Sequence, residues 1–259
     1  MRKICMGAAI ASLALAASAN AGVLLGVASY APFTQQGLYA IDSISGAATL
    51  IGNTGLVNIN GIAFNATNGT LYALTTTADW YKLDVNTGAS TLISANTGII
   101  PEGDILIGTS GAYAVNGDAF GSLSLNTGAF GFIGNIGDDV SDLSGLAFDD
   151  DGSVLGYAKN GSDEDSLVRI NPVTGVASAI GLTGINTASN VGGLTRDVDS
   201  GELFLTDGST LFSVNRVTGA ATSIGAHGPL NFSGLASIPA PGAMGLVVAC
   251  AIVGGRRRR

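Results

Sequence analysis

Short runs in which apolar and polar residues alternate dominate the chain between about residue 22 and residue 238. Examples are Gly69–Leu74 (GTLYAL) and Tyr81–Val85 (YKLDV), and Asn-Gly, Asp-Gly or Thr-Gly pairs separate many of the runs. Alternation with a period of two, broken by such turn residues, is typical of antiparallel β-hairpins. Nothing in this region keeps the spacing of an amphipathic helix. The pattern therefore predicts an all-β body.

Two glycine markers recur along this body at nearly constant spacing. The first is a turn glycine before a short apolar strand, found at Gly46, Gly88, Gly128, Gly175 and Gly219. The second is a glycine that opens an apolar strand, found at Gly61, Gly103, Gly145, Gly193 and Gly234. Two further alternating runs lie between the markers, so each unit has four strands. A period of about 40 to 45 residues with four strands per unit predicts a β-propeller.

The two ends of the body predict how the ring closes. Three strands are expected near Val23–Ala28, Gly37–Asp42 and Ala47–Ile51, whereas Phe232–Ile238 looks like the first strand of a unit without successors. Pairing this last strand with the opening three completes a blade and gives five blades without an unpaired blade face. A six-bladed propeller and a β-sandwich are the alternatives that the sequence leaves open.

The beginning of the chain has the features of an export signal. Arg2 and Lys3 precede an apolar run, Met6–Ala17, and small residues suitable for cleavage follow it. We therefore assign residues 1–21 to a signal peptide and residues 22–238 to the propeller. The two cysteines, at positions 5 and 250, lie outside the propeller, so we expect a body without disulfides.

The end of the chain, residues 239–259, has a different set of targeting features. Pro239-Ala240-Pro241 precedes the apolar stretch Ala243–Gly255, and four arginines finish the chain. As a helix this stretch would be about 20 Å long, shorter than the roughly 30 Å hydrocarbon core of a bilayer. The arginines would hold the tail on the cytoplasmic side. The segment is predicted to insert transiently as a short transmembrane helix.

This order of proline motif, short apolar helix and arginine cluster resembles the PEP-CTERM sorting signal of bacterial envelope proteins. The motif reads Pro-Ala-Pro here, where the commonest form has Pro-Glu-Pro. The resemblance implies cleavage by an exosortase-like enzyme after transient insertion in the inner membrane, and delivery to the cell surface or extracellular matrix. The body is similar to the secreted repeat-type propellers that often accompany such tails.

The charge of the body limits its partners. Six of the 11 basic residues lie in the two targeting segments, so five remain against 19 acidic residues, a net charge of 5 − 19 = −14. This charge disfavours nucleic acid and anionic lipid. Divalent cations and neutral or cation-bridged polysaccharide remain compatible.

Loops that lead into the innermost strands are the expected ligand-binding region of a propeller. Polar residues precede or follow the second marker glycine in several units, and the candidates are Asn58, Glu102, Asp104, Asp142, Asn190 and Asn231. Repeated in five units, such residues would form a ring around the axis and could bind sugar hydroxyls or a hard cation such as calcium. The alternative is that they cap strands and satisfy backbone groups. No cofactor is predicted, and calcium is left open.

Catalytic signals are weak. A carbohydrate-active enzyme would use carboxylates at the starts of the inner strands, for which Asp104, Asp142 and Glu102 are the candidates. The single histidine, His227, is expected in an exposed loop, and the single tryptophan, Trp80, is a candidate surface for sugar stacking. We therefore expect a non-enzymatic exported envelope or matrix protein that binds polysaccharide or a protein partner. The alternative is a secreted carbohydrate-active enzyme.

Overall fold

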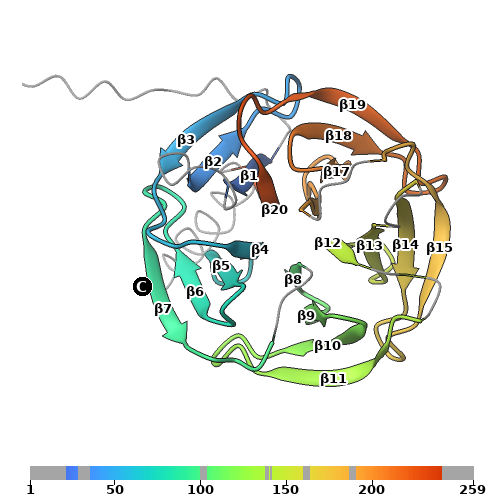
Figure 1. Cartoon of the computed structure of the whole chain (residues 1–259), viewed down its shortest axis with the longest axis horizontal. Helices are drawn as coiled ribbons and strands as arrows, with labels where there is room; N and C mark the ends of the chain where they lie inside the picture. Colours follow the sequence, from blue (N-terminus) through green and yellow to red (C-terminus); the bar gives the residue numbers. More distant parts are fainter. Residues whose placement is uncertain are drawn as a thin grey trace, which may run out of the picture.

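The computed structural model describes residues 22–28, 36–99, 104–137, 140, 142–159, 164–186 and 191–240. These residues form twenty strands in five four-stranded antiparallel sheets, which surround a central axis (Figure 1). The prediction of an all-β, five-bladed propeller is confirmed. The six-bladed propeller and the β-sandwich are wrong. Among the described residues, no helix is long and apolar enough to cross a membrane.

The blades are numbered from 1 to 5, and blade 1 contains the first described residues. The innermost strands of blades 1 to 5 are β20 (Phe232–Ile238), β4 (Ile59–Asn65), β8 (Ile105–Gly108), β12 (Leu143–Phe148) and β16 (Gly193–Arg196). The second strands are β1 (Val23–Ala28), β5 (Thr70–Thr75), β9 (Gly111–Asn116), β13 (Val154–Ala158) and β17 (Leu203–Thr206). The third strands are β2 (Gly37–Ile41), β6 (Trp80–Leu83), β10 (Ala119–Leu123), β14 (Ser166–Ile170) and β18 (Thr210–Val214). The outermost strands are β3 (Ala48–Gly52), β7 (Ser90–Ser94), β11 (Phe130–Asn135), β15 (Ala177–Leu182) and β19 (Ala221–Ala226).

Blade 1 closes the ring as predicted. Its strand order is β20-β1-β2-β3, so the last strand of the body lies beside the first one (Figure 1). The pairing of β20 with β1 runs from Val23 opposite Ile238 to Val27 opposite Gly234. Hydrogen bonds between the two ends of the body therefore remove the unpaired strands that an open ring would expose.

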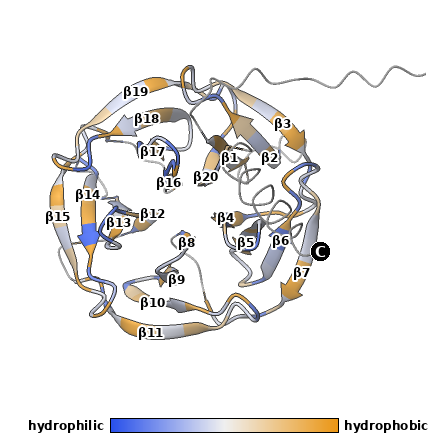
Figure 2. Ribbon diagram, turned by 180° about the vertical axis from the view of Figure 1, so that it is seen from behind, coloured by the Kyte–Doolittle hydropathy of each residue, from blue (hydrophilic) through white to orange (hydrophobic). Residues whose placement is uncertain are grey.

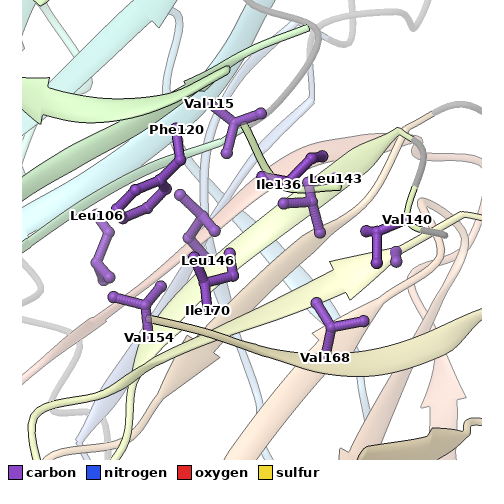
Figure 3. Close-up of a cluster of buried hydrophobic side chains, with 11 residues drawn as sticks. Leu106, Val115, Phe120, Ile136, Val140, Leu143, Leu146, Val154, Val168 and Ile170 are labelled. Carbon is purple, nitrogen blue, oxygen red and sulfur yellow. The ribbon is translucent and has the colours of Figure 1, made fainter. Parts of the chain in front are cut away.

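Apolar side chains fill the spaces between neighbouring blades. Between blades 3 and 4, Phe120 and Val115 face Leu143 and Ile170, and all four side chains are buried (Figure 3). Figure 2 shows hydrophobic residues along the strands of every blade, with hydrophilic residues concentrated in the turns. Burial of this apolar surface is the main stabilising contribution, because the described body contains no disulfide.

The first glycine marker forms the turn between the third and fourth strands of each blade. In blade 2 the Asp84 carboxylate accepts hydrogen bonds from the N–H groups of Asn86 and Thr87, at 2.8 and 3.0 Å. The N–H of Gly88 donates to the Asp84 carbonyl at 2.8 Å, with a φ of +74° at the glycine. A left-handed residue is needed at this position, which accounts for the recurring glycine.

These turn glycines also join each blade to its neighbour. A Cβ atom on Gly219 would lie 2.4 Å from the carbonyl oxygen of Gly181, in the outermost strand of the preceding blade. Equivalent contacts occur in three more joints, namely Gly46 with Gly225, Gly88 with Gly52, and Gly175 with Gly134. The fifth joint, between blades 2 and 3, differs because Gly128 packs against Trp80 and Thr97. We call these five contacts the outer ring.

Candidate functional site

The second glycine marker brings the innermost strands together around the axis. A Cβ atom on Gly145 would lie 2.4 Å from the backbone nitrogen of Leu194, and one on Gly193 would lie 2.6 Å from that of Leu235. Gly61 approaches the next inner strand in the same way, and a Cβ atom on Gly234 would lie 3.0 Å from the backbone nitrogen of Ile62. Glycine recurs at this position because adjacent inner strands approach closely there. We call the four glycines and the equivalent residue of blade 3 the inner ring.

Asp104 is the residue of blade 3 in this ring. The Asp104 carbonyl faces the N–H of Val115 on the neighbouring strand, and this pairing places Asp104 level with the four glycines. Only 1% of the residue is exposed. Oδ1 accepts a hydrogen bond from the N–H of Ile105 at 2.8 Å and lies against Gly61. The structure therefore places Asp104 beside the innermost strands near the axis, with its carboxyl group enclosed.

The environment of Asp104 combines burial with convergent hydrogen-bond donors. Burial raises the pKa of Asp104 well above its usual value. The N–H groups of Ile105, Leu146, Ile62 and Leu194 act in the opposite direction and offset part of this effect. Oδ2 is buried without a hydrogen-bond partner. The side chain thus closes the axis between the two faces of the propeller.

Two of the other predicted ring residues, Asn58 and Asp142, lie on the N-terminal face, where the innermost strands begin. Asn58 and Asp142 have positive φ angles of 56° and 47°, and their carbonyl oxygens accept the N–H groups of Thr76 and Lys159. Both side chains are exposed. Asn and Asp tolerate this left-handed conformation, so the backbone explains their recurrence in part.

The remaining members of the predicted ring do not complete it in the described residues. Asn231 is half-buried, and its side chain lies against Gly208. Glu102 and Asn190 lie outside the described residues. A ligand-binding ring on the N-terminal face therefore stays a prediction.

A pocket opens on the opposite, C-terminal face, where the innermost strands end. Its volume is about 340 Å³. Its floor includes Ile62, Ile105 and Leu146, and its walls include the half-buried rings of Phe64 and Phe148. Polar residues at its rim are Thr67, Thr109, Ser110, Asp150 and Arg196.

Sequence reasoning missed this pocket although its signal is present. Phe64 and Phe148 each stand three residues after a marker glycine, in the matching motifs Gly-Ile-Ala-Phe and Gly-Leu-Ala-Phe. We interpreted these motifs only as inner strands. The alternation of side chains along a strand also places the glycine and the phenylalanine on opposite faces of the sheet, so that their roles differ.

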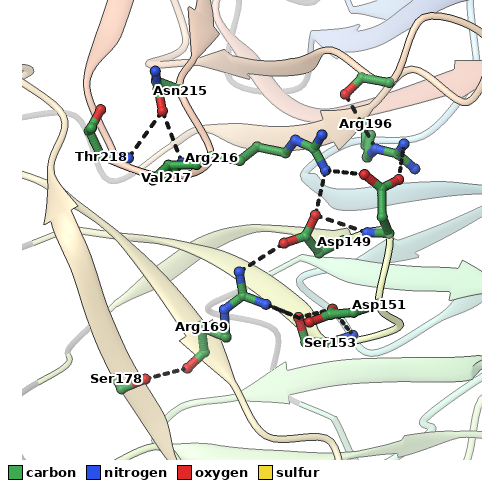
Figure 4. A network of polar contacts seen from close by, with 12 residues as sticks. Asp149, Asp151, Ser153, Arg169, Ser178, Arg196, Asn215, Arg216, Val217 and Thr218 are labelled. Atoms are coloured by element: carbon green, nitrogen blue, oxygen red, sulfur yellow. Dashed lines mark hydrogen bonds and ion pairs between the residues drawn. The ribbon is translucent and has the colours of Figure 1, made fainter.

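An ion-pair network borders the pocket (Figure 4). Asp149 pairs with Arg169 at 2.8 Å and also with Arg216, while Asp150 pairs with Arg216 at 2.7 Å and with Arg196. Burial would raise the pKa of Asp149, but the Asp150 N–H and the guanidinium groups of Arg216 and Arg169 outweigh it and hold the pKa below its usual value.

This network bears on calcium binding, because the acidic run at residues 149–151 offers three neighbouring carboxylates. Arg169 pairs with Asp151 at 3.1 Å, so all three carboxylates of the run are paired with guanidinium groups. Within the described ranges, no group of three or more acidic, histidine or cysteine side chains is arranged to hold a metal ion. The run is therefore better explained as an ion-pair cluster.

Two single residues lie differently from expectation. His227 is 4% exposed, so the expectation of an exposed loop histidine is wrong. Its Nδ1 is 2.8 Å from the Gly46 carbonyl and its Nε2 is 3.0 Å from the Thr206 hydroxyl. Trp80 is fully buried, and its Nε1 donates to the Leu125 carbonyl at 3.1 Å. Trp80 therefore offers no exposed surface for a sugar.

Comparisons with known proteins reveal a shared fold. No protein-family model matches the chain, and no curated protein matches it by sequence. A chain in the crystal structure of a nidogen–laminin complex is similar, with a TM-score of 0.54 and 13% identity over 84% of this chain and 86% of that one. A protein proposed to be a gluconolactonase has a TM-score of 0.50 and 15% identity, over 83% and 82%. The PQQ-bound aldose sugar dehydrogenase of Streptomyces coelicolor has a TM-score of 0.45 and 14% identity, over 75% and 87%.

These neighbours overturn the expectation that the protein is not an enzyme. A protein proposed to be a gluconolactonase shares the fold, as does a chain of the nidogen–laminin complex. At 13–15% identity the likeness shows the fold alone, and this fold is compatible with an enzyme, so weak catalytic signals in the sequence do not exclude one. The function has to be argued from the site itself.

Proposed function

We propose that the protein binds a small sugar or sugar derivative in the pocket of the C-terminal face. The observation that carries this proposal is the combination of two half-buried phenylalanine rings with a polar rim. A volume of about 340 Å³ falls in the range of pockets for small molecules. Mostly apolar walls with a few polar groups are also typical of such sites.

Sugars fit this arrangement because their rings present both apolar C–H faces and hydroxyl groups. Phe64 and Phe148 supply apolar surface, while Ser110, Asp150 and Arg196 supply donors and acceptors at the rim. The fold shared with a protein proposed to be a gluconolactonase supports the same ligand class.

Hydrolysis of a sugar lactone is a second candidate, favoured by that likeness. Asp150 and Arg196 form an ion pair at the rim of the pocket. A carboxylate in this position could accept a proton from a water that attacks the lactone carbonyl carbon, and could return it to the ring oxygen when the ring C–O bond breaks. The guanidinium could stabilise the negative charge that develops on the carbonyl oxygen. Because both candidates involve the same ligands, one experiment can measure binding and hydrolysis together.

The test is a titration of the purified chain with monosaccharides, aldonic acids and their lactones, by calorimetry and with a hydrolysis assay in parallel. Phe64→Ala should weaken saturable binding at least tenfold. Asn58→Gly is the matched control, because it removes a side chain from the N-terminal face while glycine retains the positive φ.

The outcomes separate the candidates. Loss of binding in Phe64→Ala with retention in Asn58→Gly supports the pocket, and release of acid from the lactone supports turnover. Loss in Asn58→Gly alone would instead favour the predicted ring of the N-terminal face. Absence of saturable binding by every ligand in the series would contradict the proposal.

We also propose that the protein is exported and that an exosortase-like enzyme processes its tail. The features that support this are the apolar and arginine-rich ends of the chain. β20 ends at Ile238, and the N–H of Ala240 donates to Asp199 Oδ2 at 2.6 Å, so the tail leaves the body beside the pocket. Cell-surface polysaccharide or an envelope protein would then be partners. The mass of the mature protein recovered from cells tests both cleavage sites, and an uncleaved mass would contradict processing.

A further inference from the structure

The innermost strand of each blade has one edge without a sheet partner, and this edge faces the axis. Each of these strands pairs with its own second strand only, as in β20-β1 or β4-β5. Its N–H groups on the axial side therefore need acceptors from outside the sheet. At the inner ring, a Cβ atom on the glycine would come within 2.4 to 3.0 Å of the next innermost strand in four of the five blades.

Asp104 supplies the missing acceptor for several blades at once. The N–H of Ile105 reaches its Oδ1 from the same blade, and the N–H groups of Ile62, Leu146 and Leu194 interact with the carboxyl group from blades 2, 4 and 5. Four blades thus direct donors toward one enclosed carboxyl group, while Oδ2 remains without a partner.

We propose that this inner ring is a binding site for a small carboxyl group, which the chain fills with its own Asp104. Removing the Asp104 side chain leaves a space lined by backbone N–H groups, and formate from solution occupies it. The proposal is independent of the sugar pocket, because it concerns the closed end of the axis and not its open mouth.

The site lies directly behind the floor of the pocket. Ile62, Ile105 and Leu146 line the pocket, and their backbone N–H groups point toward the Asp104 carboxyl group on the other side. Asp104 therefore acts as a plug that gives the pocket a closed floor. It is a positioning residue, because its enclosed carboxyl group has 1% exposure and does not line the pocket.

The test uses Asp104→Gly, which gives blade 3 the residue that the other four blades already have. We expect the melting temperature to fall by about 5 °C or more, because several buried N–H groups lose their acceptor. Sodium formate at about 100 mM should then raise the melting temperature of the variant by about 3 °C relative to the same concentration of sodium chloride. The unaltered protein should show no such difference.

Leu167→Ala is the matched control for a general effect of formate on a weakened protein. Leu167 is fully buried in β14, the third strand of blade 4, which pairs with β13 and β15 and not with an innermost strand, so its removal destabilises the fold away from the inner ring. An equal formate effect in both variants, or none in Asp104→Gly, would overturn the proposal. The pH dependence identifies the form bound, since stronger rescue at pH 5 than at pH 7 indicates the uncharged acid and equal rescue indicates the anion.

A second measurement covers the case in which Asp104→Gly does not fold. Asp104→Ala keeps a Cβ atom and therefore has a less flexible backbone than Asp104→Gly. Formate is titrated into this variant after ¹⁵N labelling, and the amide signals are followed by NMR. Saturable shifts of the amide signals of Ile62, Leu146 and Leu194 are expected. Shifts that remain linear with formate, or that spread evenly over all blades, would count against the site.

Discussion

The inner ring and the outer ring follow the same plan with one exception each. In both, four of the five blades use glycine so that the backbone of one blade can touch the next. The exception in the inner ring is Asp104, and the exception in the outer ring is the joint in which Gly128 packs on Trp80. Both exceptions involve blade 3, so the departures from fivefold symmetry occur together.

The chemistry of the two exceptions differs because their surroundings differ. The inner ring is lined by N–H groups without sheet partners, so the side chain that stands in place of a glycine there, Asp104, is a hydrogen-bond acceptor. The joint in the outer ring lies between apolar faces of blades, where Trp80 is stacked on Tyr72 at 5.1 Å between ring centroids. The indole also donates to a carbonyl of blade 3. Asp104 thus meets the need for an acceptor at the inner ring, whereas the outer ring keeps its turn glycine, Gly128, which packs on side chains instead of a backbone.

The largest expected effect comes from breaking the inner ring at a glycine. In Gly145→Ala the new Cβ would meet the backbone nitrogen of Leu194 at 2.4 Å, and a backbone cannot move aside without separating two blades. We expect a loss of more than about 4 kcal/mol in the free energy of unfolding, or failure to fold. Chemical denaturation followed by circular dichroism measures it. A variant within about 1 kcal/mol of the unaltered protein would show that the ring is not tightly packed.

Breaking the outer ring at a glycine should have a smaller effect. Gly219→Ala combines a strained φ of +81° with a contact of 2.4 Å to the Gly181 carbonyl, and we expect a loss of about 3 kcal/mol. Gly69→Ala is the control, because Gly69 also has a positive φ, of +67°, but faces open space. Its loss should be about 1 kcal/mol. Equal losses in the two variants would mean that the joint between blades contributes nothing.

The exceptional joint is tested with Trp80→Phe. The substitution removes the donor to the Leu125 carbonyl and reduces the buried ring, so we expect a loss of about 2 kcal/mol. Tyr113→Phe is the control, because among the described residues the Tyr113 hydroxyl makes one long contact, of 3.5 Å, to the Ser110 carbonyl. It should change stability by less than about 0.5 kcal/mol. An unchanged stability in Trp80→Phe would contradict a role for the indole in joining blades 2 and 3.

The repeat and the closure of the ring could be predicted because the marker glycines answer requirements that recur from blade to blade, even though Asp104 takes the place of the glycine in the inner ring of blade 3. Asp104 could be placed near the axis for the same reason, but its enclosure depends on backbone atoms from four blades. The pocket escaped prediction because Phe64 and Phe148 have the sequence signature of core residues. His227 was misjudged because the carbonyl that covers it belongs to Gly46, 181 residues away.

His227 provides a pH-dependent test at the joint between blades 5 and 1. Burial lowers its pKa, although the Gly46 carbonyl and Asp207 act against this effect. The unfolded chain therefore takes up the proton more readily than the folded one, and stability is lost as the pH falls below the ordinary value of 6.5. The difference in unfolding free energy between the unaltered protein and His227→Gln should decrease from pH 7 to pH 5. A constant difference would show that the histidine does not titrate differently on folding.

The ion pairs at the rim of the pocket should have the smallest effect, because they lie outside both rings. Arg216 connects its own blade with Asp149 and Asp150 of blade 4, but Asp149 keeps Arg169 and Asp150 keeps Arg196 when Arg216 is replaced. We expect Arg216→Gln to reduce the unfolding free energy by about 0.5 kcal/mol at low salt and by less in 1 M sodium chloride. Denaturant titrations at the two salt concentrations measure this difference. A salt-independent loss above about 2 kcal/mol would indicate that the network is a third connection between blades, comparable to the glycine contacts.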